Sequence, residues 1–422
     1  MFRWISIALL FCGASLAVSA QTGAVQVLDL NTCYQQALVH NERVGVAAAE
    51  WRAAEARYRQ VRDTLLPAIS VGGSATFQND RREDGNDSAS REPERYSAAL
   101  RAEQVLYQGF RITREMEARE AGGRAARWDE RRVRELLYLD VADAFHQVVL
   151  NERDLGVVDR LVQVLKETQA ELERRVKLGR SRKAELLQAQ TALAEARVEQ
   201  ETARGQVALA RELLAFLMGQ PAEGWQLKDE TPFPSAPDLA AKLEKAIQRA
   251  DVLAGAERAE AARKALQAAR GERQPEVRAA GNYYLVEDPD EDREWDVALT
   301  LNLPLFDEGA RRAGVREQME QAAISELNLA ALRRQAASEV RSAYLTFVST
   351  SAQKARLQEG VAAATASYEE QQRDYELGRA SQLDALSALA QVQRLARRAL
   401  AADIRARVSL VQLHVAAGEG AP

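Results

Sequence analysis

The chain has 422 residues, with 57 Lys and Arg against 62 Asp and Glu and a formal net charge of −5. The two signs are interspersed, which is typical of solvated helix faces and excludes the strongly basic surface that nucleic-acid binding requires. We therefore expect no nucleic acid among the partners.

The first 20 residues have the pattern of a secretory signal peptide: Arg3, an apolar run and the small-residue site Val18-Ser19-Ala20. Cleavage there gives a mature chain that begins at Gln21; an uncleaved anchor is the weaker alternative, because the apolar run is short for a spanning helix. Cys12 leaves with the signal, so Cys33 has no partner for an internal disulfide and lipidation is not expected. Since no long apolar segment follows, any membrane crossing must be made by strands.

After a first helical region, period-two alternation predicts two strands beyond Pro67, at 69–77 and 96–106. Each has about the 9 to 11 residues that a tilted strand needs to cross a bilayer. The charged, turn-rich segment 79–94 between them is expected to be a loop on the outer side of a barrel.

Residues 110–218 contain no proline and are rich in Ala, Leu, Glu, Arg and Gln, which predicts long amphipathic helices. The stretch from about 110 to 176 would be on the order of 100 Å long. Gly179 suits a sharp turn into a return helix, because such a turn usually needs a residue with positive φ. The proline-rich segment 219–237 is the expected linker.

The second half repeats the first at an offset of roughly 200 residues. Pro275 lies opposite Pro67, strands are expected at 277–285 and 295–305, and the helical stretch 310–375 precedes Gly378. The segment from Arg175 to Ser181 matches that from Asp374 to Ala380. Each repeat is therefore predicted to be helix, strand, strand, very long helix, turn, helix.

Four strands cannot close a barrel, because single-chain barrels begin at about eight strands and open edges in lipid leave backbone groups unsatisfied. The chain must therefore oligomerise. Two copies would give eight strands and three would give twelve, and only the larger barrel leaves an obvious aqueous lumen. A simple coiled-coil rod is the alternative without a membrane function, but it does not account for the paired strands before each long helix.

These features resemble the TolC-type outer-membrane efflux proteins over nearly the whole mature chain. The local marks are Leu106-Tyr107-Gln108-Gly109, its counterpart from Leu303 to Gly309, and the Leu-Gly turns at Gly179 and Gly378. The resemblance implies a mainly α fold with a β-barrel part: a homotrimer with a twelve-stranded barrel in outer-membrane lipid, continued by a long periplasmic α-helical barrel. The implied function is passive export through the outer-membrane channel of a tripartite efflux or type I secretion system.

The resemblance also implies partners, namely a periplasmic adaptor and, through it, an inner-membrane pump. The residues implied to contact the adaptor are the two turns at the periplasmic tip: Lys177, Leu178, Gly179, Arg180 and Ser181, and Glu376, Leu377, Gly378, Arg379 and Ala380.

The family's periplasmic end is often narrowed by acidic side chains just after the second turn, and Asp384 occupies the first such position. A ring of three carboxylates favours cations. Ser387 stands where a second acidic residue is usual, so this sequence departs from the pattern. Glu185 and Tyr375 match members of the polar network that latches the closed state, whereas Ala380 replaces a basic partner, which predicts a weaker or different latch.

The sequence contains no phosphate-binding loop and no set of nucleophile, base and acid at recognisable spacing. We expect neither catalysis nor a cofactor or metal site. The alternatives that remain are a heavy-metal exporter of the same family and a periplasmic coiled-coil adaptor or structural protein.

The predicted organisation along the chain is a signal peptide (1–20), a periplasmic helical region (21–66), the first β-hairpin (67–107), the first long helix, turn and return helix (108–218), the linker (219–238), a helix of the second repeat (239–274), the second β-hairpin (275–307) and the second long helix, turn and return helix (308–422).

Overall fold

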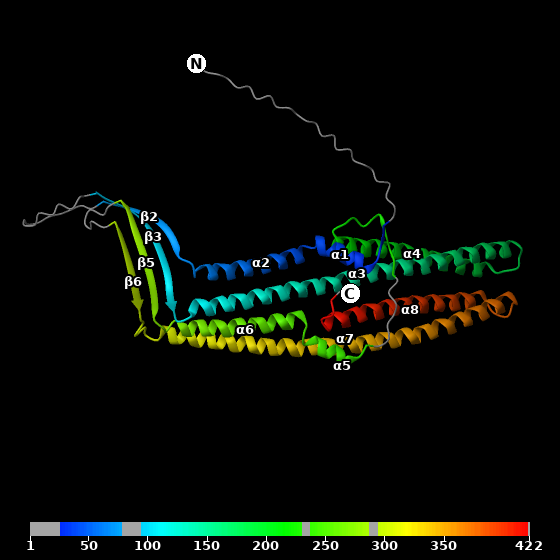
Figure 1. Ribbon diagram of the computed structural model, residues 1–422. Coiled ribbons are helices and arrows are strands. Elements are labelled where there is room, and N and C mark those ends of the chain that lie inside the picture. Colours follow the sequence, from blue (N-terminus) through cyan, green and yellow to red (C-terminus); the bar gives the residue numbers. More distant parts are fainter. Residues whose placement is uncertain (1–25, 78–93, 230–236, 287–293, 421–422) are drawn as a thin grey trace, which may run out of the picture.

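The computed structural model describes residues 26–77, 94–229, 237–286 and 294–420. The expected signal peptide and nearly all of the expected outer loop at 79–94 lie outside these residues. The described chain is elongated, with a four-stranded sheet at one end and the α3–α4 and α7–α8 turns at the other (Figure 1). The elements in chain order are β1 (Gln26–Leu28), α1 (Leu30–His40), α2 (Glu42–Asp63), β2 (Ala68–Phe77), β3 (Glu94–Gln108), α3 (Arg111–Lys177), α4 (Lys183–Met218), β4 (Trp225–Leu227), α5 (Leu239–Ala246), α6 (Ala250–Gly271), β5 (Glu276–Val286), β6 (Trp295–Asn302), α7 (Ala310–Glu376) and α8 (Gln382–Ala416).

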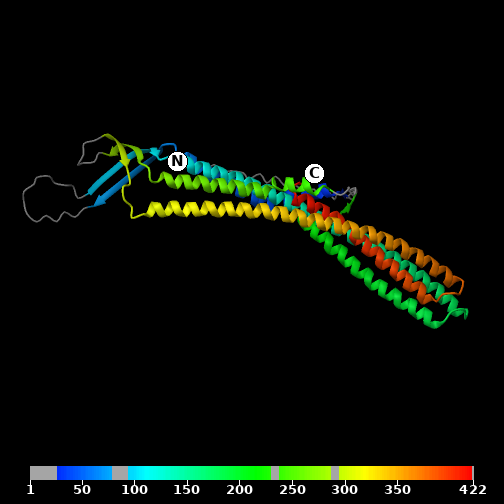
Figure 2. The same cartoon turned by 90° about the horizontal axis from the view of Figure 1, so that it is seen from below.

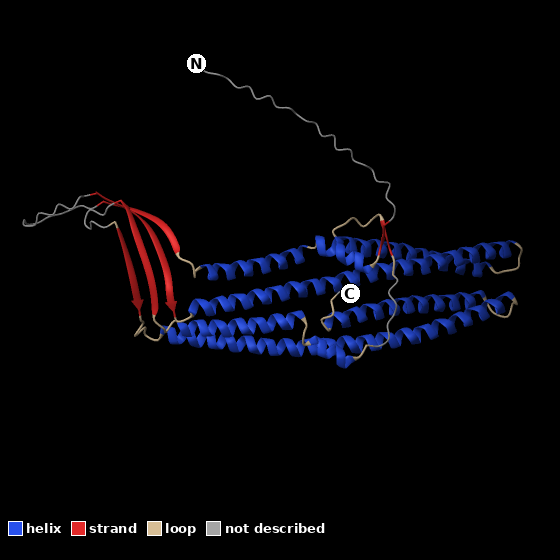
Figure 3. Ribbon diagram, in the orientation of Figure 1, coloured by secondary structure: helices blue, strands red, loops and turns tan. Residues whose placement is uncertain are grey.

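The four long strands form one antiparallel sheet in the order β2-β3-β5-β6, so the hairpins of the two repeats lie side by side (Figure 3). Gly281 of β5 pairs with Ala102 of β3 and with Val297 of β6. Apolar side chains on the sheet are exposed in the single chain; Val71 is 69% exposed and Val297 is 72% exposed. A sheet of this kind, with two open edges, requires both lipid and further strands.

The fourth strand is shorter than the sequence suggests, because β6 ends at Asn302 and not near residue 305. Pro304 has no amide hydrogen to donate to a ladder, which accounts for the early end. The alternation of leucines continues beyond the strand, but Leu305 is 88% exposed and lies in the connection to α7.

Two very long helices, α3 and α7, run from the sheet to the opposite end of the molecule and have 67 residues each, about 100 Å. Near the sheet α2 packs on α3, and α6 packs between α3 and α7; beyond the middle, α4 pairs with α3 and α8 with α7. Figure 2 shows the bend near the middle of the molecule, where the first arrangement gives way to the second.

Each long helix begins after a pair of residues with positive φ at the end of the sheet. These pairs are Gly109 and Phe110 before α3, and Glu308 and Gly309 before α7. A Cβ at Gly109 would lie 2.6 Å from the carbonyl oxygen of Gly271, so both the conformation and the space require glycine there. The expected repeat is thus present in the backbone conformation as well as in the sequence.

The main apolar core lies at the middle of the molecule, where α1, α3 and α4 meet; it includes Leu28, Phe145, Leu214 and Met218. Trp225, in the segment expected to be an irregular linker, is only 4% exposed and belongs to this core. Its strand β4 pairs in parallel with β1, which ties the linker to the start of the described chain. The sequence predicts neither β1 nor β4, because three residues are too few to show a period-two pattern.

No helix in the described part of the chain combines the length and the apolar character that crossing a membrane would need.

Candidate functional site

The candidate site is the pair of helix-to-helix turns at the end of the molecule farthest from the sheet. The first turn (residues 177–181) joins α3 to α4, and the second turn (residues 376–380) joins α7 to α8. Figures 1 and 2 both show the two turns at the same end. The leucine at the apex of each is exposed, Leu178 by 68% and Leu377 by 65%.

The two turns have the same backbone geometry. In the first, Gly179 has φ of 69°, and the amide of Arg180 donates to the carbonyl of Arg175 at 2.8 Å. In the second, Gly378 has φ of 73°, and the amide of Arg379 donates to the carbonyl of Asp374 at 2.7 Å. This is the hydrogen-bond pattern of a Schellman cap, in which a left-handed glycine ends a helix. The glycines therefore have the conformational role that the sequence predicts.

Asp384, the expected constriction residue, is also the N3 residue of a capping box at the start of α8, whose N-cap is Ser381. The backbone amide of Ser381 donates to the Asp384 carboxylate at 2.9 Å, and the Asp384 amide donates to the Ser381 hydroxyl at 3.3 Å. This reciprocal pair is a capping box. The hydrogen bond from the Ser381 hydroxyl, together with that from the backbone, holds the pKa of Asp384 below its ordinary value of 3.8. The side chain is exposed, so its carboxylate is charged and open to solvent.

Glu185 holds the corresponding place at the start of α4. Its carboxylate accepts hydrogen bonds from the Ser181 hydroxyl and from Nε of Arg182, the latter at 3.1 Å. The bond from Ser181 is the main cause that lowers the pKa of Glu185. Both partners directly precede α4, so in the described chain Glu185 stabilises the start of its own helix, and neither Tyr375 nor Asp384 is among its partners.

Tyr375 makes the contact between the two hairpins near the turns. The guanidinium carbon of Arg175, at the end of α3, lies 5.5 Å from the centre of the Tyr375 ring. Arg175 is held in place by Glu171, one helical turn earlier, through a 2.8 Å ion pair. Arg175 is a residue of this contact that sequence reasoning does not identify, although it lies in the segment that aligns the two repeats. The sequence gives no signal for this contact, because Tyr375 lies 200 residues away from Arg175 in the chain.

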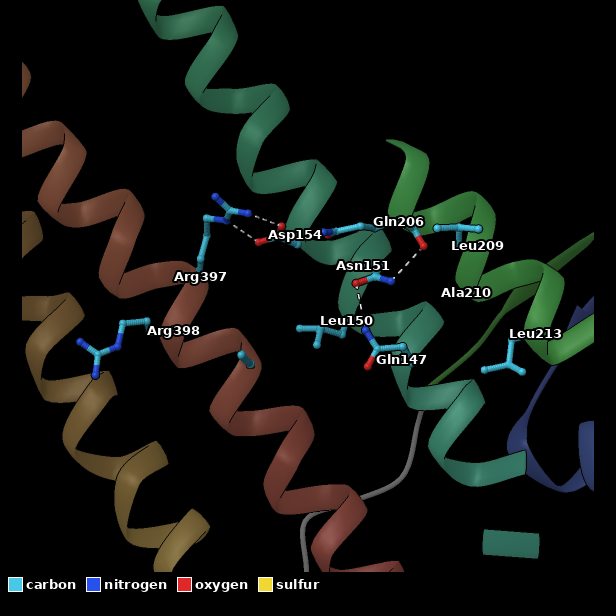
Figure 4. A pocket seen from close by; sticks show the side chains of 11 residues that line it. Gln147, Leu150, Asn151, Asp154, Gln206, Leu209, Ala210, Leu213, Arg397 and Arg398 are labelled. Atoms are coloured by element: carbon cyan, nitrogen blue, oxygen red, sulfur yellow. Dashed lines mark hydrogen bonds and ion pairs between the residues drawn. The ribbon is translucent and has the colours of Figure 1, made fainter. Parts of the chain in front are cut away.

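A second link between the hairpins lies nearer the middle of the molecule, at a groove of about 670 Å³ between α3, α4 and α8. Figure 4 shows Arg397 of α8 directed at Asp154 of α3, at 2.7 Å and 2.8 Å. On the other side, Asn151 donates to the backbone oxygen of Gln206 at 3.1 Å. The contacts of this groove join helices, and its other walls are largely apolar.

Buried titratable groups lie away from the turns. Burial lowers the pKa of His146, on α3 in the central core, to about 4, and raises the pKa of the Cys33 thiol to about 12. Both groups are therefore uncharged at neutral pH. Among the described residues, no group of three or more His, Cys, Asp or Glu side chains could hold a metal ion.

Comparison with solved structures shows the same fold in bacterial membrane proteins. The chain superposes on CusC with a TM-score of 0.82 at 21% identity, covering 93% of this chain and 92% of that one. The outer membrane protein VceC of Vibrio cholerae superposes with a TM-score of 0.81 at 20% identity, covering 93% of this chain and 96% of VceC. The open state of the MtrE outer membrane channel of Neisseria gonorrhoeae superposes with a TM-score of 0.78 at 20% identity, covering 93% of this chain and 89% of MtrE.

Comparison with curated protein sequences finds no match. The model of one protein family, described as outer membrane efflux protein, matches residues 33–220 and 243–419. The two matched blocks follow the two repeats and leave out the segment that contains β4, and together they cover most of the chain. The chain therefore belongs to the outer membrane efflux protein family, whose TolC-type members are outer-membrane channels.

Proposed function

We propose that three copies of this chain form the exit duct of a tripartite export system, receiving substrates from a periplasmic adaptor and, through it, from an inner-membrane pump. The observation that carries the proposal is the polarity of the molecule. A sheet with exposed apolar side chains lies at one end, and two exposed hairpin turns lie roughly 100 Å away at the other. The first end suits lipid, and the second suits a protein partner on the far side of the periplasm.

Three copies supply twelve strands, and the open edges β2 and β6 of each sheet then pair with those of its neighbours. The long helices continue the barrel as a water-filled tunnel. Transport through it is passive, because the energy for export is supplied by the pump. The turns at 177–181 and 376–380 are the adaptor-docking surface of this proposal.

Asp384 and Tyr375 form the gate in this proposal, with Glu185 supporting the first turn. Three copies of Asp384 around the three-fold axis give a ring of carboxylates that attracts cations and repels anions. The lowered pKa of Asp384 keeps that ring charged at periplasmic pH. Arg175, held against Tyr375, takes the place of the basic residue that is missing at Ala380.

The test begins with extraction of the protein from outer membranes in mild detergent, followed by measurement of its oligomeric mass and of single-channel conductance in a planar bilayer. A conducting trimer is the expected result. A monomer without conductance would refute the proposal. Docking is tested separately, by chemical cross-linking from a single cysteine introduced at Leu178 to the adaptor co-expressed with it, with a cysteine at the exposed Val297 on the sheet as control.

A further inference from the structure

The two turns are alike in backbone but differ in charge: the first is strongly basic and the second is balanced. The ten residues around the first turn, 174–183, include six basic side chains and no acidic one; the aligned residues around the second turn, 373–382, include two of each sign. The basic residues of the first set are Arg174, Arg175, Lys177, Arg180, Arg182 and Lys183, and the charged residues of the second are Arg373, Asp374, Glu376 and Arg379. The chain as a whole is nearly balanced in charge, so the basic excess at the first turn is a local feature.

Half of the first turn's cations are already engaged within the chain. Arg174 and Arg175 pair with Glu171, at 2.7 Å and 2.8 Å. Arg182 pairs with Glu185 at 3.1 Å. These ion pairs join residues of the same helix or of its cap, and so they stabilise the helix ends on either side of the turn.

The other three cations, Lys177, Arg180 and Lys183, are exposed, and no residue in the described part of the chain forms an ion pair with them. They lie within five residues of the exposed apical Leu178 in the sequence. Like charges near one another repel, and a partner that brings negative charge relieves the repulsion. The first turn therefore offers an exposed leucine together with three nearby cations that have no ion-pair partner among the described residues.

We infer that the first turn is the docking site for a helical-hairpin tip of the adaptor that carries acidic residues. The second turn, with the same backbone but balanced charge, does not share this preference for acidic residues. The inference rests on the proposed function, since it specifies the chemistry of the adaptor that the exit duct receives. Complementary charge would steer the adaptor to one of two turns that are otherwise alike, and so would set its rotational register on the trimer.

A pair of designed helical hairpins tests this inference. The two probes are identical except that three tip residues are Glu in one and Gln in the other. Binding to the purified trimer in nanodiscs is measured by surface plasmon resonance at about 50 mM and about 300 mM salt, because the screening length shortens between these concentrations. We expect the acidic probe to bind on the order of tenfold more tightly at low salt, with the difference reduced at high salt.

The test variant is Lys177→Gln/Arg180→Gln/Lys183→Gln, which should bind the two probes equally. The matched control, Arg160→Gln/Lys166→Gln/Arg197→Gln, removes three exposed cations from the same hairpin. Its nearest position, Lys166, is eleven residues before Lys177. This separation is roughly 16 Å along the helix, which exceeds the screening length of about 14 Å at about 50 mM salt. The control should keep the full preference for the acidic probe.

A third variant guards against loss of binding through misfolding. Lys177→Glu/Arg180→Glu/Lys183→Glu should prefer a probe with three Lys at its tip over the acidic one. Wild-type protein that binds neither probe, or both equally at low salt, overturns the inference, as does a test variant that keeps the preference. Conductance of the same preparations distinguishes failure of this inference from failure of the proposed function. A trimer that conducts but does not prefer the acidic probe overturns the docking inference and leaves the channel function intact.

Discussion

Arg175 at the end of α3 and Tyr375 at the end of α7 are in cation–π contact, with 5.5 Å from the guanidinium carbon to the ring centre. The contact joins the two hairpins of one chain immediately before their turns. A channel that opens by separating these hairpins must break it. An exposed contact of this kind contributes about 0.5 to 1 kcal/mol.

The Arg175→Gln variant should therefore raise the open probability of single channels roughly two- to fivefold, which is the population shift that this free energy allows. The control is Arg174→Gln, since Arg174 also pairs with Glu171, at 2.7 Å, but does not stack on Tyr375. Equal open probabilities for the two variants would mean that the contact has no part in the latch.

Charge and capping can be separated at Asp384. Asp384→Asn removes the charge and keeps an oxygen that can accept the hydrogen bond from the Ser381 amide, whereas Ser381→Ala removes the hydroxyl of the capping box and keeps the carboxylate. We expect Asp384→Asn to lower the cation-to-anion permeability ratio by several-fold, and Ser381→Ala to leave it unchanged.

Ser381→Ala should instead lower the melting temperature, because loss of an N-cap typically costs about 1 kcal/mol. Reversal potentials under a salt gradient give the permeability ratio, and circular dichroism gives the melting temperature. If Asp384→Asn has the wild-type permeability ratio, Asp384 is not part of the constriction and serves only in the capping box.

His146 makes the stability of the chain depend on pH. Burial lowers its pKa from 6.5 to about 4, so below pH 6.5 the unfolded chain binds a proton that the folded chain does not. Stability is therefore unaffected by this group above pH 6.5 and falls as the pH drops from 6.5 to 4, by roughly 3 kcal/mol in all.

Urea unfolding of wild-type protein and of His146→Leu at a series of pH values measures this dependence. The variant should lose less stability than the wild type between pH 6.5 and 4, while the two proteins should follow parallel curves above pH 7, where the imidazole is neutral in both states. Parallel curves over the whole range would show that His146 is accessible to protons in the folded chain.

Arg249 is only 1% exposed and holds several segments together. It pairs with Asp251 at 2.7 Å and with Glu339 of α7, and it donates to the carbonyl oxygen of Ala416 at the end of α8 at 3.2 Å. Arg249→Met keeps much of the volume but leaves both carboxylates without this partner. We expect a loss of roughly 3 kcal/mol in the free energy of unfolding.

The control for this loss is Arg356→Met. Arg356 pairs with Glu359 on the surface of α7, and its side chain is 82% exposed, so its removal should change stability by less than about 0.5 kcal/mol. Chemical unfolding of both variants gives the comparison. Losses of equal size would mean that the buried network around Arg249 does not stabilise the junction of α6, α7 and α8.

Periodicity, proline placement and the repeat were sufficient to predict the strands of the sheet, the two very long helices and the glycine turns from sequence. Each of these is a local pattern or a repeat of one, and an element of 67 residues without a helix breaker allows few alternatives. The start of α3 and of α7 could be placed to within a residue or two, because Gly109 and Gly309 mark them.

The tertiary structure alone decided which side chains meet. It placed Trp225 in the core, Arg175 on Tyr375, and Asp384 in the cap of its own helix. The first two contacts join segments far apart in the chain and depend on how helices pack, which no local pattern encodes. Asp384 was visible as an acidic residue after a turn, but only the coordinates show that Ser381 donates to its carboxylate and so lowers its pKa.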